Sequence, residues 1–167
     1  EAAHPDKACI RHFESLGLSV KRTHPVTVTG AARGGLSIDA EECPDAVPTL
    51  AVVATQLPER SMVTRVGILR HKESDRLAAC VDLLQRAGHR ANVEGEQLTI
   101  DPGVARDFEF DARDDHRMAM SAAVLAYLSN VTVRLKGRES VEKSFPGFLS
   151  EFFKVAPRNC VEEPSIL

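Results

Sequence analysis

The chain has 167 residues, of which 43% are hydrophobic and 27% charged, enough for one ordinary core. A net charge of −3 with mixed signs gives no general attraction to nucleic acid, and no apolar run approaches the roughly 20 residues that cross a bilayer. Four cysteines without a Cys-x-x-Cys pair argue against a disulfide scaffold or a zinc site and fit a reducing compartment. We therefore expect a cytoplasmic protein without membrane or nucleic-acid partners.

The amino end reads Glu-Ala-Ala-His-Pro, with neither an initiator methionine nor a signal-peptide core, so we expect a fragment of a longer protein. Residues 13–17 end a helix with glycine just past the cap, and two short alternating strands follow. The glycine-rich stretch 30–35 lacks the spacing of phosphate or dinucleotide loops and is interpreted as a turn. A strand over 36–39 and a helix opened by Asp45, at or near its N-cap, complete this part.

The clearest helix follows a dense cluster of opposite charges at residues 69–76, which itself comes after a strand around 63–66. Apolar residues recur there at helical spacing and predict one buried stripe of Leu77, Cys80, Val81 and Leu84. The residues expected to face solvent on the same helix are Asp82, Gln85 and Arg86. A glycine at position 88 ends the helix, and two alternating strands follow.

In the last third of the chain, Asp115 opens another apolar helical run. A strand over 131–135 follows, and Lys143 then precedes a further helix. Phe145-Pro146 announces that helix, because proline suits the first helical turn. Residues 155–167 show no convincing alternation and are expected to be irregular.

Sliding the sequence along itself by about 70 positions superposes these elements and indicates an internal repeat. In this comparison Asp45 falls on Asp115, and Lys72 falls on Lys143. We expect one domain over residues 1–157. The domain consists of a partial repeat, a complete strand-helix-strand-helix-strand-strand repeat and a second partial repeat, over residues 1–34, 35–104 and 105–157. A tail over residues 158–167 follows the domain. Something outside the chain is expected to complete the sheets.

Three helix starts that carry cations suggest one anionic ligand, because exposed N–H groups at a helix start favour anions. The residues at these helix starts also have simpler, purely structural explanations. Asp45 and Asp115 also suit helix caps worth about 1 kcal/mol, and residues 72–76 also suit a solvated helix start whose charge pairs contribute a few tenths of a kcal/mol each. A metal site at residues 114–116 is disfavoured, because adjacent residues at a helix start point in different directions.

Four segments in the same order resemble the enolpyruvyl transferases, and among them the enzymes that act on shikimate 3-phosphate. The segments are Pro44-Asp45-Ala46, Lys72-Glu73-Ser74-Asp75-Arg76-Leu77, Asp115-His116-Arg117-Met118-Ala119-Met120 and Val141-Glu142-Lys143-Ser144-Phe145-Pro146-Gly147-Phe148. The resemblance implies an α/β fold of repeated βαβαββ units, an inside-out, barrel-like arrangement with helices inside and sheets outside. It also implies that the chain is most of a carboxy-terminal domain, completed by a missing amino-terminal domain.

The resemblance further implies transfer of enolpyruvyl from phosphoenolpyruvate to the 5-hydroxyl of shikimate 3-phosphate, with release of phosphate and no cofactor. Protonating a methylene carbon and deprotonating a hydroxyl call for two carboxylates in different environments. The implied site residues divide by role. The catalytic candidates are Asp45, Glu73 and Lys72, of which Asp45 and Lys72 also bind shikimate 3-phosphate. The candidates for binding phosphoenolpyruvate are Arg76, Arg117, Lys143 and His116.

Two other functions remain open from the sequence. One is a free-standing anion-binding or interaction module that has lost catalysis. The other is a domain of the related enzyme that transfers the same group to a nucleotide sugar, whose catalytic cysteine lies in the other domain. Because ligands in the family lie between two domains, we expect no turnover from this chain alone.

Overall fold

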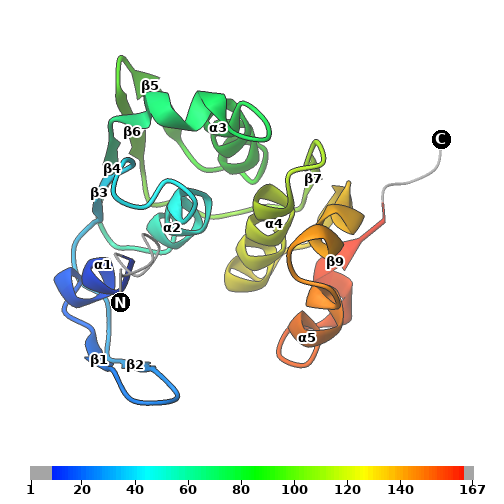
Figure 1. Ribbon diagram of the computed structural model, residues 1–167, viewed down its shortest axis with the longest axis horizontal. Helices are drawn as coiled ribbons and strands as arrows, with labels where there is room; N and C mark the ends of the chain where they lie inside the picture. The colour runs from blue at the N-terminus through cyan, green and yellow to red at the C-terminus, as the bar shows by residue number, and fades with distance from the viewer. Residues whose placement is uncertain (1–8, 164–167) are drawn as a thin grey trace.

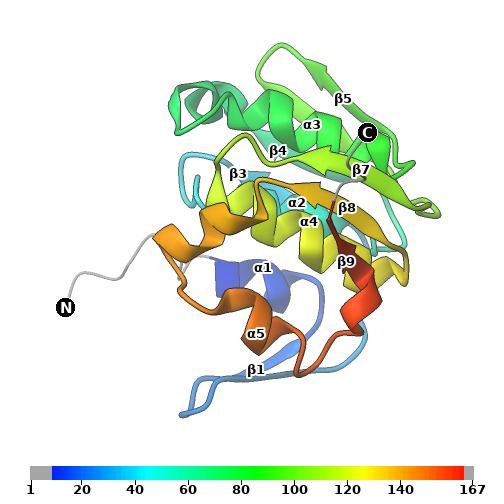
Figure 2. The ribbon, with the colours of Figure 1, turned by 90° about the vertical axis from the view of Figure 1, so that its right-hand side faces the viewer.

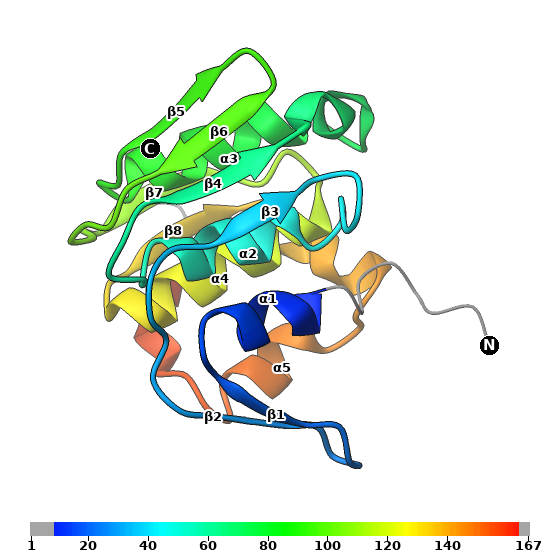
Figure 3. The ribbon, with the colours of Figure 1, turned by 90° about the vertical axis from the view of Figure 1, so that its left-hand side faces the viewer.

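The computed structural model describes residues 9–163; the two ends of the expected domain and tail, residues 1–8 and 164–167, lie outside the described residues. The chain begins with α1 (Cys9–Ser15) and a two-stranded antiparallel hairpin, β1 (Ser19–Lys21) and β2 (Thr27–Thr29). In Figure 3 this hairpin lies away from the rest of the molecule. The two short strands and the connecting stretch 30–35 agree with the sequence prediction.

A complete repeat unit follows the hairpin. It contains β3 (Ser37–Asp39), α2 (Val47–Ala54), β4 (Ser61–Thr64), the 3-10 helix η2 (Val66–His71), α3 (Arg76–Arg86), β5 (Ala91–Glu94) and β6 (Gln97–Ile100). Its sheet has the order β3-β4-β6-β5, in which β3 and β4 are parallel and the other pairs antiparallel. The six regular elements are those that the alternating and helical patterns predicted, in the predicted order.

A second unit begins again with the same elements. It contains β7 (Phe108–Asp111), α4 (His116–Ser129), β8 (Val133–Lys136), the 3-10 helix η3 (Arg138–Lys143), α5 (Phe148–Phe152), the 3-10 turn η4 (Arg158–Cys160) and β9 (Val161–Glu162). The prediction that residues 155–167 are irregular is wrong for residues 158–162, because η4 covers 158–160 and β9 adds a parallel strand to β8. Two paired residues are too few to show alternation in a sequence.

Helices lie inside and sheets outside, as the family resemblance implies. Figure 1 shows α2, α3 and α4 between the β3–β6 sheet on one side and the β7–β9 sheet on the other. Figure 2 shows the second sheet in front of α4, and Figure 3 shows the first in front of α2 and α3. Within residues 9–163 the sheets remain separate, so the described part of the chain does not form a closed barrel.

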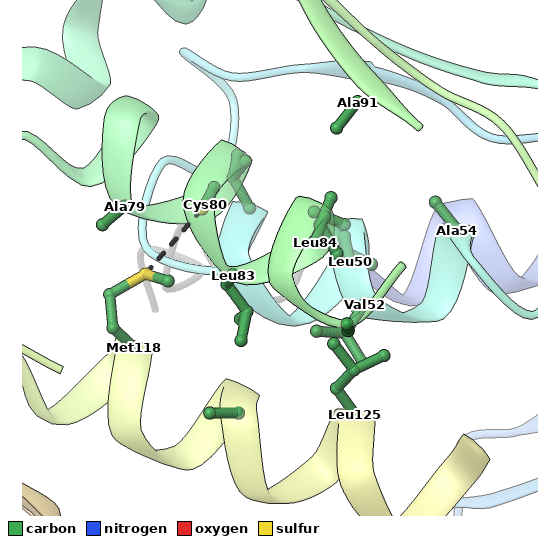
Figure 4. Packing of buried hydrophobic residues seen from close by; sticks show 14 of the residues in the cluster. Leu50, Val52, Ala54, Ala79, Cys80, Leu83, Leu84, Ala91, Met118 and Leu125 are labelled. Carbon is green, nitrogen blue, oxygen red and sulfur yellow. Dashed lines mark hydrogen bonds between the residues drawn. The ribbon is translucent and has the colours of Figure 1, made fainter. Parts of the chain in front are cut away.

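The core is the three-helix interface between the sheets. Figure 4 shows Cys80 and Leu83 of α3 facing Met118 and Leu125 of α4, with α2 alongside; the Cys80 sulfur lies 3.8 Å from that of Met118. Leu83 is 1% exposed although the single-stripe pattern left it out, because α3 packs against both α2 and α4 and not against one sheet alone. Val81, predicted in the stripe, is only half-buried.

Helix ends follow local rules where a capping residue is available. Asp75 caps α3 by accepting the backbone N–H of Ala78 at 3.0 Å, and Gly88 ends it with φ of +100°, which only glycine adopts easily. The predicted start at Pro146 is wrong. Gly147 has a left-handed φ of +77° and interrupts the helix there, so α5 starts only at Phe148.

The structural repeat differs in detail from the offset of about 70. The backbone N–H of Ala40 donates to Thr64 O at 3.0 Å, and that of Ala112 donates to Lys136 O at 3.0 Å, so both partners shift by 72 residues. Three residues beyond each alanine lie Cys43 and Asp115, both fully buried. Counted from the strand, Asp115 falls on Cys43, and counted from the helix starts it falls on Ala46, the N-cap of α2. On neither count does it fall on Asp45.

The two 3-10 helices bear on the second pair of residues that the sequence repeat superposes, Lys72 and Lys143. η2 and η3 each have six residues and follow a residue in left-handed backbone, Arg65 and Gly137. Lys143 ends η3 as His71 ends η2, whereas Lys72 comes one residue later. Lys72 and Lys143 are consequently not equivalent in the fold.

Candidate functional site

Six charged side chains gather where α2, α3 and α4 begin, and we call them the charge cluster. Its members are Asp45, Lys72, Glu73, Arg76, Asp115 and Arg117. Asp45 lies two residues before α2, the segment around Lys72 leads into α3, and Asp115 is the N-cap of α4. The fold thus brings three helix starts together, each with N–H groups that no carbonyl of its own helix accepts.

Arg76 is the centre of the charge cluster, with a side chain of zero exposure. Its Nε donates to Asp115 Oδ2 at 3.1 Å, its Nη1 donates to Asp45 Oδ1 at 2.8 Å, and its Nη2 donates to Glu73 Oε2. Burial opposes the guanidinium charge, but the hydrogen bond and charge of Asp115 outweigh it and raise the pKa of Arg76. The sequence predicted a ligand-binding arginine; in this structure Arg76 is instead covered and engaged by three carboxylates.

Asp115 is the second fully buried member. Its Oδ1 accepts the backbone N–H groups of Arg117 at 3.0 Å and Met118 at 3.4 Å, and its Oδ2 accepts Ser74 Oγ and Arg76 Nε, both at 3.1 Å. The simpler reading as a helix cap is confirmed for Asp115, but the cap uses only one of the two oxygens. The sequence prediction did not include this residue in the site, although it stood in the Asp-His-Arg string.

Asp45 is not a helix cap; Ala46 holds the N-cap position of α2, without a side-chain hydrogen bond. Besides Arg76, Asp45 Oδ1 lies 3.5 Å from Lys72 Nζ, and Oδ2 accepts Arg117 Nη2 at 3.1 Å. Arg117 Nη1 also donates to the backbone oxygen of Asp45 at 3.0 Å. One carboxylate therefore joins the starts of all three helices.

The reachable surface of the charge cluster is formed by four members. Their exposed fractions are 25% for Lys72, 29% for Arg117, 36% for Asp45 and 54% for Glu73. Arg76 and Asp115 lie beneath them. Because three cations balance three carboxylates, an anion gains net attraction here only by displacing a carboxylate from Lys72 or Arg117.

Two predicted residues lie at the edge of the charge cluster. His116 is the first residue of α4 and half-buried, and it takes no part in the hydrogen bonds described above. Lys143 is 56% exposed and pairs with Asp114 at 2.8 Å, next to the N-cap of α4. A surface pair of this kind contributes about 0–1 kcal/mol, so Lys143 can leave Asp114 at little cost.

The Asp45 carboxyl gives a prediction that needs no ligand. Partial burial would raise its pKa, but Arg117, Lys72 and Arg76 outweigh burial and hold the pKa below its ordinary value. We expect carbon NMR of the carboxyl to give a pKa below about 3.9. The ionised form then stabilises the fold above the unfolded-state pKa, and this contribution disappears as pH falls through the folded-state pKa.

Arg117→Gln is expected to move the pKa of Asp45 upward, because it removes a cation at 3.1 Å. The matched control is Arg134→Gln, on β8, where the exposed arginine pairs with Glu109. A pKa of Asp45 at or above the ordinary value in the unsubstituted chain would contradict the geometry of the charge cluster.

Among the described residues no helix is long and apolar enough to cross a membrane. Within the same part of the chain, no group of three or more His, Cys, Asp and Glu side chains is arranged to hold a metal ion. Burial raises the pKa of the Cys80 thiol to about 12, so this thiol, although it lies in the core near Arg76, stays protonated at neutral pH.

The chain is similar to a family of known proteins. The family model described as EPSP synthase (3-phosphoshikimate 1-carboxyvinyltransferase) matches residues 3–152. The 3-phosphoshikimate 1-carboxyvinyltransferase of Methanoculleus marisnigri is 40% identical over 146 residues, covering 86% of this chain and 34% of the relative. That of Thermococcus kodakarensis is 34% identical over 152 residues, covering 90% and 38%.

The fold has a counterpart among solved structures. An EPSP synthase from Acinetobacter baumannii superposes with a TM-score of 0.75 at 20% identity, over 93% of this chain and 40% of that one. At this identity the likeness concerns the fold alone. The chain spans about a third of the length of the curated relatives that it matches.

Proposed function

The chain belongs to the EPSP synthase family, and from that premise we propose that it supplies the carboxy-terminal part of a 3-phosphoshikimate 1-carboxyvinyltransferase. That enzyme transfers the enolpyruvyl group of phosphoenolpyruvate to the 5-hydroxyl of shikimate 3-phosphate and releases phosphate. The observation that carries the proposal is the meeting of three helix starts at Asp45, with Lys72 and Arg117 reachable from outside. Helix starts and cations together favour a ligand rich in phosphate and carboxylate oxygens.

The roles of the carboxylates follow from their surroundings. Asp45 is held ionised by three cations, so it suits accepting the hydrogen bond of the substrate hydroxyl and orienting it. A lowered pKa makes it a weak base until ligand binding separates it from those cations. Glu73 has more than half of its side chain exposed, and with Lys72 beside it in sequence it suits proton transfer at the methylene carbon.

The cations of the proposed site differ in how deeply their side chains are buried. Arg117 and Lys143 are partly or largely exposed and are proposed to hold the phosphoenolpyruvate oxyanions, with His116 as a neighbouring donor. Lys72 is proposed to contact shikimate 3-phosphate. Arg76 is proposed to fix the three carboxylates in the unliganded state; a direct bond to phosphoenolpyruvate requires it to exchange Asp45 or Glu73 for the ligand.

We propose that the rest of a longer polypeptide completes both the sheets and the site. The exposed hairpin supports this. Val26 and Val28 of the first partial repeat are 50% and 44% exposed, whereas Leu98 and Ile100, their counterparts in the complete repeat, are fully buried and pair with β4. A strand in the place of β4 would cover the two valines.

The test is an amide NMR titration of this chain with phosphoenolpyruvate, with shikimate 3-phosphate and with both. We expect shifts at Asp45, Lys72, Glu73 and Arg117, and no detectable turnover from the chain alone. Arg117→Gln is expected to abolish the phosphoenolpyruvate shifts, whereas Arg134→Gln, on the outer sheet, leaves them unchanged. Shifts confined to other faces, or turnover by this chain without the remaining two-thirds, would refute the proposed half-site.

The same titration separates the alternatives. A free-standing anion-binding module predicts tight binding of one phosphorylated ligand by this chain, insensitive to the second ligand. A domain acting on a nucleotide sugar predicts shifts with a uridine-diphosphate sugar in place of shikimate 3-phosphate.

A further inference from the structure

Asp115 does more in this structure than cap a helix. Its two oxygens accept four hydrogen bonds at zero exposure. Asp115 Oδ1 accepts backbone N–H groups of the first turn of α4, which carries Arg117. Asp115 Oδ2 accepts hydrogen bonds from Ser74 Oγ and Arg76 Nε, which belong to the segment that carries Lys72 and Glu73. The carboxylate is therefore a direct tie between the two halves of the charge cluster's surface.

The first repeat unit has a different residue at the same distance from its strand. At the corresponding position of the first turn stands Cys43, also fully buried, whose sulfur lies 3.9 Å from His12 Nε2. The two turns start from the same strand-to-strand hydrogen bond and lead into helices that pack together. The first turn is three residues longer before its helix and, over its described residues 40–46, has no residue in left-handed backbone, so the charged group belongs to a shorter turn of different conformation.

The backbone before Asp115 supports the same conclusion. Arg113 and Asp114 have φ values of +50° and +65°, left-handed backbone that costs non-glycine residues about 1–3 kcal/mol each. Within the described chain, only this one of the two turns places residues in that region. Such conformations persist where the surrounding structure over-determines them, often at functional sites. Here they present the Asp115 carboxylate to the interior, facing Ser74 and Arg76.

We infer that Asp115 is a positioning residue, which holds the Lys72–Asp75 segment against the start of α4 so that Lys72 and Glu73 face the same ligand as Arg117. The inference rests on the proposed function for the identity of that ligand only. It adds Ser74 as the contact through which the position of the segment is set. Loss of this contact moves Lys72 away from Asp45 while the cap and the buried Arg76 pair remain.

Two variants test this without any ligand. Ser74→Ala removes the tie and leaves the cap, and Asp115→Asn keeps an efficient capping side chain without its charge. We expect Ser74→Ala to raise the pKa of Asp45 toward its ordinary value, since Lys72 is no longer held beside it. In Asp115→Asn the loss of a nearby anion acts in the opposite direction, so amide exchange is the readout for that variant. We also expect amide exchange of residues 72–75 to become at least tenfold faster in both variants. Ser121→Ala on α4, whose buried Oγ has no hydrogen-bond partner within the described chain, is the control and should change neither readout.

A role confined to helix stability predicts a different outcome. The thermal midpoint would fall in Asp115→Asn while exchange in the segment stays as in the unsubstituted chain, and the pKa of Asp45 would be unchanged in Ser74→Ala. This outcome would overturn the inference. Titration of the unsubstituted chain with phosphoenolpyruvate distinguishes this from failure of the proposed function. An unresponsive chain whose segment still loosens in Ser74→Ala refutes the ligand and leaves the positioning role standing.

Discussion

Arg76→Met is expected to destabilise this chain by about 3–5 kcal/mol, measured as the free energy of unfolding in urea. The guanidinium is the only cation that contacts the fully buried Asp115 carboxylate among the described ion pairs. Methionine fills similar volume but leaves that charge without a counterion, and such a charge is far costlier than a lost surface pair. The expected loss is a large fraction of the stability of an ordinary domain.

The control for this prediction is Arg134→Met, which removes an exposed pair with Glu109 and should cost no more than about 1 kcal/mol. A double variant, Arg76→Met with Asp115→Leu, removes both buried charges at once. It is expected to be more stable than Arg76→Met alone, despite the lost cap, because no unpaired charge remains. A loss below about 1 kcal/mol for Arg76→Met would show that water or another cation reaches Asp115 in solution.

The regular elements of the fold were predictable because their signals are local. The glycines at positions 17 and 88 end helices in left-handed backbone, and Asp75 and Asp115 cap helices through their own side chains. The strand pairs alternate over enough residues to be recognised. None of these features depends on which other element lies nearby, so the sequence alone carries them.

Features that depend on neighbours were missed. Leu83 is buried because α3 has helices on two sides, and β9 exists because β8 offers an edge to two residues that show no pattern of their own. Pro146 looked like a first-turn proline, but Gly147 after it takes a left-handed φ. The offset of about 70 displaced the equivalences by one or two residues, enough to pair Asp45 with Asp115 and Lys72 with Lys143.

Five of the six members of the charge cluster were predictable from the sequence, but how deeply each is buried was not. Residues 45, 72, 73, 76 and 117 were selected from separate segments, and the structure brings them into one set of ion pairs. Sequence spacing does not say that the first residue of α3 is covered by the start of α4, so Arg76 was assigned to the ligand and Asp115 to a cap. Only the packing of the two helices shows that these charges form a buried pair beneath the reachable surface.

In the complete enzyme proposed above, Glu73→Gln is expected to lower kcat by about 10²–10⁴-fold. Glutamine keeps the shape of the side chain and still accepts the hydrogen bond of Arg76 Nη2, but it cannot exchange a proton with the methylene carbon. Because ligand-binding cations remain, KM for phosphoenolpyruvate is expected to change much less than kcat. Steady-state kinetics with each substrate varied in turn measures both quantities.

The kinetics of Glu73→Gln are to be compared with those of Asp45→Asn in the same enzyme. An asparagine at position 45 frees Arg117 and Lys72 from a negative charge, so phosphoenolpyruvate should bind at least as tightly. The amide oxygen still accepts a hydrogen bond from the substrate hydroxyl, but it lacks the charge of the carboxylate and cannot take the proton. Asp82→Asn, at an exposed pair with Arg86 on α3, controls for the loss of any carboxylate. If Glu73→Gln retains kcat within about threefold, proton transfer belongs to Lys72 or to the proposed missing part of the enzyme, and Glu73 serves only to anchor Arg76.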